Sequence, residues 1–200
     1  MERLLIFDFD GVLADTFELS YRIFKEQVPT LTKTEYRRWF DENLHTYLKR
    51  KKIELSMPKF YAKYAEALKN VRLASGWKST LPALHKVFSM AIISSSDEDG
   101  INGYLLSNGI KPLFNQVWGV QKSASKVEKI QGLLEETGVT AENSWFVTDT
   151  RGDLEEVSST GIKTIAFASG FHSRTRLKKG KPNKVVKTPV ELSNFLLRTN

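Results

Sequence analysis

Short apolar runs separated by helix-like stretches recur along the chain, and this alternation constrains its fold more than any other feature. The runs are bounded by turn-forming residues and have the length of buried strands. They lie at 4–9, 90–94, 116–120, 144–149 and 164–168. Amphipathic helices are expected at 126–137, 152–160 and 189–198. Because strands that alternate with helices form βαβ units, we expect the α/β class, with a doubly wound, mostly parallel sheet covered on both faces.

The stretch from about 15 to 75 breaks this alternation because it contains no convincing strand. Its apolar periodicity predicts helices around 17–28, 33–51 and 57–70. Thr32 and Glu35 have the spacing of a capping box, which marks a helix start. We therefore expect a small α-helical domain of residues 15–75 inserted into a core domain formed by 1–14 and 76–200. The alternative is that these helices simply cover one face of the sheet.

Composition limits the class of protein. A chain of 200 residues with 40% hydrophobic residues is long enough to bury a core with one insertion. The absence of cysteine excludes disulfides, thiolate metal sites and cysteine nucleophiles. The first apolar run is too short for a secretory signal, and no window has the length of a membrane span, so we expect a cytoplasmic protein without a membrane partner. The net charge of +7 favours anionic partners without identifying them.

Carboxylates follow the first and fourth predicted strands. Asp8 and Asp10 are two residues apart, so strand alternation sends both to one side, and Gly11 allows a sharp turn beside them. The fourth strand ends at Asp149, and Asp153 follows four residues later. Because the carboxyl ends of parallel strands line the ligand crevice of such a sheet, we expect these four carboxylates to meet there.

Four such carboxylates require a cation among them. Two carboxylates about 5 Å apart repel by roughly 3 kcal/mol at an effective dielectric constant near 20. Mg²⁺ fits best, because it prefers oxygen ligands and is often held by a few carboxylates together with substrate phosphate oxygens. Zinc has little support, since cysteine is absent and the three histidines lie far apart in the sequence. The predicted metal ligands are Asp8, Asp10, Asp149 and Asp153.

The remaining polar groups suit phosphoryl transfer. Asp8 can attack phosphorus as a carboxylate nucleophile and form an aspartyl-phosphate. Asp10 can protonate the departing oxygen and then take a proton from the attacking water. Ser94 and Ser95, at the end of the second predicted strand, and Lys126 are expected to hold the phosphoryl oxygens.

Each of these residues also has an ordinary structural interpretation when it is taken alone. Asp153 has the position of a helix cap. Ser94 can satisfy a strand end, and Lys126 can be an exposed lysine. Lys122 is a second candidate for the phosphate-binding lysine.

Four segments in order along the chain carry a resemblance to a known family. They are DFDGVLADT at 8–16, AIISSS at 91–96, SKVEKI around Lys126, and VTDTRGD at 147–153. With the helical insertion between the first and second, they resemble the haloacid dehalogenase superfamily, in its phosphoglycolate phosphatase-like branch with a helical cap. The resemblance covers nearly the whole chain and implies a Rossmann-like core.

The resemblance also implies roles for individual residues. By it, Asp8 is the nucleophile and a metal ligand, and Asp10 is the acid/base and offers its backbone carbonyl to Mg²⁺. Asp149 ligates the metal and Asp153 supports it, while Ser94 and Lys126 bind phosphate. Two departures from the family pattern are visible: Thr148 stands where many members have glycine, and Lys126 lacks the proline that often follows it.

The sequence thus predicts a Mg²⁺-dependent phosphatase that hydrolyses a small phosphomonoester, phosphoglycolate-like or a sugar phosphate, through an aspartyl-phosphate. One alternative is a phosphosugar mutase of the beta-phosphoglucomutase type, which uses the same residues. Another is a non-catalytic protein that binds nucleic acid through the basic segment 172–187, which we instead expect to be a surface loop. The expected partner is a small phosphorylated metabolite rather than nucleic acid, and the expected assembly is a monomer or homodimer.

Substrate choice is expected to lie in the insertion, whose hinges would be 11–16 and 75–76. Candidates for contacting an anionic leaving group are Tyr21, Arg22, Lys25 and the run 49–52, although such a charge run is more often a solvated helix face. The insertion's aromatic residues are expected to form its core. They are Trp39, Phe40, Phe60 and Tyr64.

Overall fold

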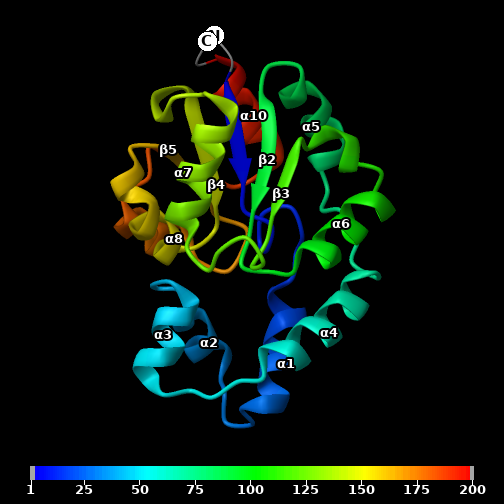
Figure 1. Ribbon diagram of the computed structural model, residues 1–200, viewed down its shortest axis with the longest axis vertical. Helices are drawn as coiled ribbons and strands as arrows, with labels where there is room; N and C mark the ends of the chain where they lie inside the picture. The colour runs from blue at the N-terminus through cyan, green and yellow to red at the C-terminus, as the bar shows by residue number, and fades with distance from the viewer. Residues whose placement is uncertain (1–2, 199–200) are drawn as a thin grey trace.

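Six parallel strands form one sheet in the computed structural model, which describes residues 3–198. The strands are β1 (Leu4–Phe7), β2 (Ser89–Ile93), β3 (Gln116–Trp118), β4 (Ser144–Thr148), β5 (Lys163–Phe167) and β6 (Lys184–Val186). Their order across the sheet is β3-β2-β1-β4-β5-β6, so β1 lies between β2 and β4 (Figure 1). The predicted doubly wound parallel sheet is confirmed.

Helices cover both faces of this sheet. The flanking helices are α5 (Trp77–His85), α6 (Glu98–Ser107), α7 (Lys126–Thr137), α8 (Arg151–Glu156), α9 (Arg174–Leu177) and α10 (Pro189–Arg198). Phe7 packs in one hydrophobic cluster with residues of α5, α6 and α10, whereas its neighbour Ile6 packs in a second cluster with Ile130 and Leu133 of α7. Successive strand residues point to opposite faces, and both faces are buried, which explains the uninterrupted apolar runs in the sequence.

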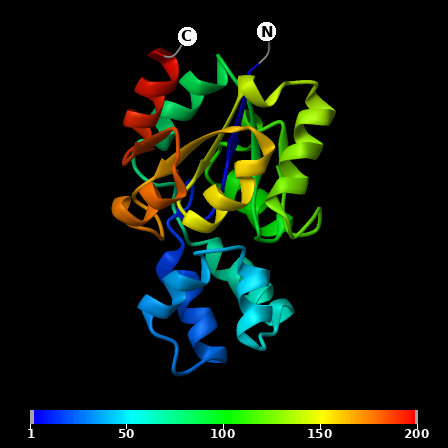
Figure 2. The same cartoon turned by 90° about the vertical axis from the view of Figure 1, so that its left-hand side faces the viewer.

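Four further helices lie together beyond the carboxyl ends of the strands (Figures 1 and 2). They are α1 (Phe17–Gln27), α2 (Lys33–Trp39), α3 (Leu44–Lys51) and α4 (Met57–Leu68). The capping box is present at Thr32, whose side chain accepts a hydrogen bond from the backbone of Glu35. The single helix expected over 33–51 is wrong. The Asn43 side chain caps a separate helix, α3, by accepting from the backbone amides of His45 and Thr46.

The basic segment 172–187 is not the surface loop expected from its composition. It contains α9, a short 3-10 helix over Lys178–Gly180 and the edge strand β6. Leu177 and Val186 are buried, and the Arg176 guanidinium forms an ion pair with Asp41 of the helical insertion. The pairing of β6 with β5 and the burial of Leu177 and Val186 hold this segment against the core, although its charge pattern predicted a surface loop. No helix among residues 3–198 is long and apolar enough to cross a membrane.

Candidate active site

The turn after β1 brings the first two carboxylates beside β4. The Asp8 amide donates to the Val147 carbonyl at 2.8 Å, which continues the β1–β4 pairing by one residue. Gly11 has φ +71°, and a Cβ there would lie 1.9 Å from Oδ2 of Asp149. Only glycine fits this turn, because any side chain would displace the Asp149 carboxylate.

Lys126 lies between two carboxylates. Its Nζ donates to Oδ2 of Asp8 at 2.6 Å and to Oδ2 of Asp153 at 2.7 Å, and its side chain is buried. The lysine is the first residue of α7, which Ser125 caps, so the helix start fixes its position. The Thr148 hydroxyl donates to the same Asp153 oxygen at 2.6 Å. Threonine, at a position where many members of the resembled family have glycine, therefore adds a donor to this cluster.

The two carboxyl groups that share Lys126 differ in acidity. Burial raises the pKa of Asp8 to about 8, although the Lys126 ammonium acts to lower it. Burial also acts to raise the pKa of Asp153, but Lys126 and the hydrogen bonds outweigh it and lower this pKa to about 2. The two carboxylates hold the pKa of Lys126 above its ordinary value despite burial. Asp153 thus holds its negative charge more firmly than Asp8.

Asp149 is fully buried and only partly satisfied. Its Oδ2 accepts a hydrogen bond from the Phe171 amide at 2.5 Å, whereas its Oδ1 has no hydrogen-bond partner. Burial, with the nearby charge of Asp8, raises the pKa of Asp149 well above its usual range. A buried carboxylate oxygen without a partner is costly, so this atom is suited to a cation.

Asp10 is held by hydroxyl groups rather than by cations. Its Oδ1 accepts from Thr16 at 2.7 Å and from the phenol of Tyr64, and its Oδ2 accepts from Ser96 at 2.7 Å and from Ser94 at 3.4 Å. The sequence did not indicate Thr16, Tyr64 or Ser96 as partners of Asp10, because they come from three different elements. Hydroxyl groups therefore occupy both carboxylate oxygens of Asp10.

One cavity of about 450 Å³, counting the part open to solvent, is lined by all seven predicted site residues. They are Asp8, Asp10, Ser94, Ser95, Lys126, Asp149 and Asp153. The loop between α2 and α3 contributes Phe40, Glu42 and Asn43 to the same wall. The structure therefore brings the predicted residues together, while their roles stay predictions.

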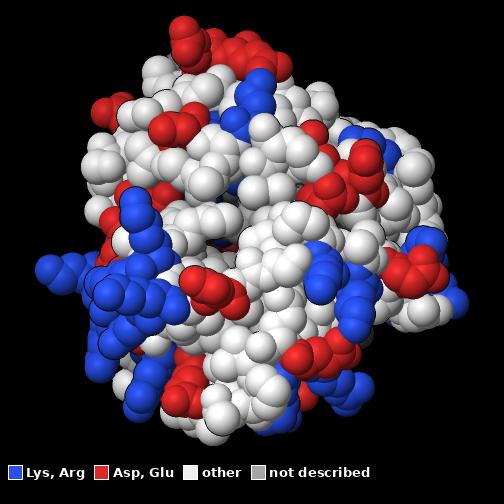
Figure 3. Space-filling view, turned by 60° about the horizontal axis from the view of Figure 1, so that its bottom comes forward, with Lys and Arg blue, Asp and Glu red and all other residues white. Residues whose placement is uncertain are grey.

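The other candidates lie elsewhere. Lys122 is exposed, with its Nζ 4.3 Å from the centre of the Trp118 ring, and does not line the cavity. Arg22 and the run 49–52 are exposed, and Lys25 donates to the Leu31 carbonyl at 2.8 Å. Figure 3 shows a dense cluster of Lys and Arg side chains at one side of the face that it views. None of these cations lines the cavity.

The fit of Mg²⁺ depends on the donor set. Within residues 3–198 no group of three or more histidine or carboxylate side chains is arranged as a metal cluster, since Asp8 and Asp153 both face Lys126. The donors are nevertheless all oxygen atoms, and Oδ1 of Asp149 lacks a partner. This chemistry fits Mg²⁺ rather than a softer metal.

A second buried lysine was not anticipated. Lys129 lies three residues after Lys126 on the inner face of α7, and its Nζ donates to the carbonyls of Ser94 and Gly119. Burial, with the nearby charge of Lys126, lowers the pKa of Lys129 to about 8. The helical spacing from Lys126 was the one signal in the sequence. Lys129 thus ties α7 to the strand end that carries Ser94.

Comparison with known proteins identifies the family. The model of the haloacid dehalogenase-like hydrolases matches residues 5–167. The chain belongs to this family. A phosphoglycolate phosphatase from Synechococcus elongatus is 23% identical over 201 residues, which cover 95% of this chain and 95% of that protein. This haloacid dehalogenase-like protein is therefore a hydrolase, as its sequence motifs predicted.

Solved structures share the fold of this haloacid dehalogenase-like hydrolase. A haloacid dehalogenase-like family protein from Streptococcus pneumoniae superposes with a TM-score of 0.80 at 18% identity, over 98% of both chains. A Thermotoga maritima protein described as a candidate beta-phosphoglucomutase superposes with a TM-score of 0.72 at 20% identity, over 100% of both chains. At such identities these likenesses show the fold alone.

Proposed function

We propose that this protein is a Mg²⁺-dependent phosphatase that hydrolyses a small phosphomonoester through an aspartyl-phosphate on Asp8. The observation that carries the proposal is the pairing of Asp8 with the buried Lys126 ammonium in the cavity that Asp10 also lines. A nucleophile, a cation for phosphoryl oxygens and a separate acid/base group are what phosphoryl transfer requires. The similarity to a phosphoglycolate phosphatase supports the same reaction class.

In the first step, a carboxylate oxygen of Asp8 attacks phosphorus as the ester P–O bond breaks. The departing alcohol oxygen takes the proton of the Asp10 carboxyl group. In the second step, Asp10 takes a proton from water as this water attacks phosphorus, and the bond to the Asp8 oxygen breaks. Inorganic phosphate leaves, and both carboxyl groups return to their starting states. General acid–base help of this kind is worth roughly 10²–10⁴-fold in rate.

Three groups of the chain bind the phosphoryl oxygens in this scheme. Lys126 supplies the positive charge, and Ser94 and Ser95 supply hydroxyl donors from the end of β2. Because the Lys126 side chain is buried, its charge acts with little screening by water.

We propose that Asp8, Asp149 and Asp153, with the backbone carbonyl of Asp10, hold the Mg²⁺. The unpartnered Oδ1 of Asp149 supports this assignment. The bound ion would supply charge that favours the ionised form of Asp8, whose pKa burial raises, and that offsets the repulsion between this carboxylate and the phosphoryl oxygens.

We also propose that residues 15–75 form a cap over the site. Contacts between this segment and the core support the idea: the Gly152 amide donates to the Phe40 carbonyl at 3.0 Å, and Arg37 donates to the Phe171 carbonyl at 3.2 Å. Gly76, at the second predicted hinge, has φ +91°. A cap that closes here excludes water from the phosphoryl group. We further propose that the enzyme is cytoplasmic and acts as a monomer or homodimer.

The test is an assay of the purified protein with p-nitrophenyl phosphate and a panel of phosphorylated metabolites, with and without Mg²⁺. We expect Mg²⁺-dependent release of inorganic phosphate that Asp8→Asn abolishes. Absence of hydrolysis in the wild type, or full turnover by the variant, overturns the proposal. An isomerised sugar phosphate without inorganic phosphate would instead assign a mutase. Tight, salt-dependent binding of labelled oligonucleotides without hydrolysis would assign a nucleic-acid-binding protein.

A further inference from the structure

A second cavity adjoins the one that holds the predicted site residues. Its volume is about 380 Å³, counting the part open to solvent. Asp10, Phe40, Leu44, Ser95 and Phe171 line both cavities. Asp10, the proposed acid for the departing oxygen, thus stands where the two meet. A phosphoryl group placed beside Asp8 and Lys126 would direct the alcohol part of the ester past Asp10 toward the second cavity.

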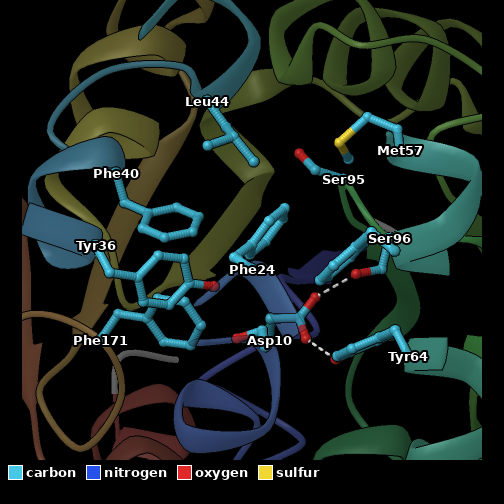
Figure 4. A pocket seen from close by; sticks show the side chains of 12 residues that line it. Asp10, Phe24, Tyr36, Phe40, Leu44, Met57, Tyr64, Ser95, Ser96 and Phe171 are labelled. Carbon is cyan, nitrogen blue, oxygen red and sulfur yellow. Dashed lines mark hydrogen bonds between the residues drawn. The ribbon is translucent and has the colours of Figure 1, made fainter. Parts of the chain in front are cut away.

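The surface that lines this second cavity is mostly apolar (Figure 4). Phe24 stacks on Phe60 with ring centres 4.1 Å apart, and Phe60 stacks on Tyr64 at 5.2 Å. Phe40 and Phe171, in edge-to-face contact at 4.9 Å, form the opposite part of the wall. Figure 4 also shows Leu44 and Met57 bordering the same space. Phe24, Phe60 and Phe171 belong to the buried hydrophobic cluster and Phe40, Leu44 and Met57 pack against it, and all six also line the cavity.

No cation balances a charge placed in this cavity. Among the described residues that line it there is no lysine, arginine or histidine, and Asp10 is the one acidic residue. The neighbouring Arg37 is directed elsewhere, because it donates to the Phe171 carbonyl and lies over the Phe17 ring. A carboxylate or second phosphate on the leaving group would be buried there without a cationic partner, which is strongly unfavourable.

Five neutral polar side chains also border the cavity: Ser20, Tyr36, Tyr64, Ser95 and Ser96. The hydroxyl of Ser20 donates to the Thr16 carbonyl, and those of Tyr64 and Ser96 donate to Asp10. The phenol of Tyr36 points toward its centre in Figure 4, and Ser95 lies at the edge shared with the catalytic cavity. Burial raises the pKa of Tyr36 above its ordinary value, so its hydroxyl keeps its proton and can donate. A hydroxyl or ether oxygen on an otherwise apolar leaving group is therefore compatible with the site, whereas an ionic group is not.

We propose that the substrate is the phosphomonoester of a compact, uncharged, apolar alcohol, whose alcohol part binds in this second cavity. The inference rests on the proposed function. It distinguishes this protein from an enzyme whose substrate has a carboxylate on its leaving group, as phosphoglycolate has. Binding of an apolar alcohol against aromatic and aliphatic walls of this kind is favourable, because it removes apolar surface from water.

The test compares two esters that differ in one charge, benzyl phosphate and 4-carboxybenzyl phosphate. For the wild type with Mg²⁺, we expect kcat/KM for benzyl phosphate to exceed that for the carboxylated ester by on the order of 100-fold. The para position keeps the carboxylate away from the reacting oxygen, so the two leaving groups have similar intrinsic reactivity. Phosphoglycolate should be as poor a substrate as the carboxylated ester.

A substitution at the cavity wall provides a second test of the same proposal. Met57→Lys places an ammonium beside the cavity, at a half-buried helix start. We expect it to lower the ratio of kcat/KM for benzyl phosphate to kcat/KM for 4-carboxybenzyl phosphate by at least about 10-fold. Met57→Leu, which keeps the wall apolar, should retain the wild-type preference. Leu106→Lys, at a side chain 66% exposed on α6 and outside the cavity, adds the same charge elsewhere and should leave the preference unchanged.

The outcomes separate the two proposals. If neither ester is hydrolysed and no other small phosphoester is, the proposed phosphatase function fails and the substrate class falls with it. If phosphoglycolate or 4-carboxybenzyl phosphate is hydrolysed as efficiently as benzyl phosphate, the apolar leaving group is wrong while the phosphatase function stands. A preference that Met57→Lys does not move would also overturn the assignment of this cavity.

Discussion

The phenol of Tyr64, on α4, donates a hydrogen bond to Oδ1 of Asp10, in the loop after β1 (Figure 4). The two residues are 54 positions apart in the sequence, and the bond joins the helical insertion to the proposed acid/base group. Burial, with the charge of Asp10, raises the pKa of Tyr64 well above its usual range, so the phenol keeps its proton. The insertion therefore helps to orient the carboxyl group that we propose acts on the leaving oxygen.

Tyr64→Phe removes this donor and keeps the ring. We expect kcat to fall about 10-fold with a smaller change in KM, because the Asp10 carboxyl loses one of the contacts that fix its rotamer. Steady-state kinetics with benzyl phosphate measure both constants. Tyr47→Phe, on α3 and outside both cavities, is the matched control. A variant that keeps full kcat would show that the bond plays no part in turnover.

Lys126→Met leaves Asp8 and Asp153 buried without their shared cation. Because removal of one partner from a buried ion pair costs about 3–5 kcal/mol, the free energy of unfolding at neutral pH should drop by this amount, and hydrolysis should be lost. Urea denaturation followed by circular dichroism measures the change. Lys122→Met, at an exposed lysine of the preceding loop, should change stability by less than about 0.5 kcal/mol. Equal stabilities of the two variants would contradict the ion-pair geometry.

The buried Lys129 should make the free energy of unfolding depend on pH in the alkaline range. Since burial lowers its pKa in the folded state to about 8 from 10.5, the unfolded chain binds more protons between these values. The stability of the wild type relative to Lys129→Met should therefore rise as pH increases from 8 to 10.5, by up to about 3 kcal/mol. Denaturation of both proteins across this range gives the difference. A flat or falling difference would mean that Lys129 is not desolvated.

Gly170→Ala tests the crowding around Asp149. A Cβ at Gly170 would lie 2.1 Å from Oδ2 of Asp149 and 2.5 Å from the Gly11 carbonyl. We expect the carboxylate to be displaced, with a loss of Mg²⁺ affinity measured by titration calorimetry and a loss of activity. Gly103→Ala is the control, because it lies in helix α6 with nothing within 4 Å of its Cβ, and alanine should stabilise it by about 0.5–1 kcal/mol. Unchanged Mg²⁺ binding in Gly170→Ala would argue against Asp149 as a ligand.

The central strands were predictable because each is a short apolar run buried on both faces. Strand β6 was missed, since only three residues, Lys184–Val186, form it and lysines surround it. Its order comes from pairing with β5, a contact between segments that no local pattern encodes. The break between α2 and α3 depends on the Asn43 cap, which competed with an apolar periodicity that runs across it.

The acidic residues of the site were predictable for a different reason. Because β1 and β4 are adjacent and parallel, Asp8 and Asp149 follow them at the same end of the sheet. The order of the sequence motifs also carried a family resemblance. The partners of Asp10 could not be predicted, because Tyr64 and Ser96 reach it only through the packing of α4 and the β2 loop. The apolar cavity was also missed, since aromatic residues at helical spacing have the same sequence pattern whether they fill a core or line a pocket.

The most direct test of the proposed aspartyl-phosphate is to trap the phosphorylated residue. Wild-type protein mixed with Mg²⁺ and benzyl phosphate is quenched in acid within one turnover, reduced with borohydride and digested for mass spectrometry. We expect that Asp8, and no other residue, is converted to homoserine, and that Asp8→Asn gives no conversion. Turnover without a reducible acyl-phosphate, or conversion at a different carboxylate, would contradict the proposal.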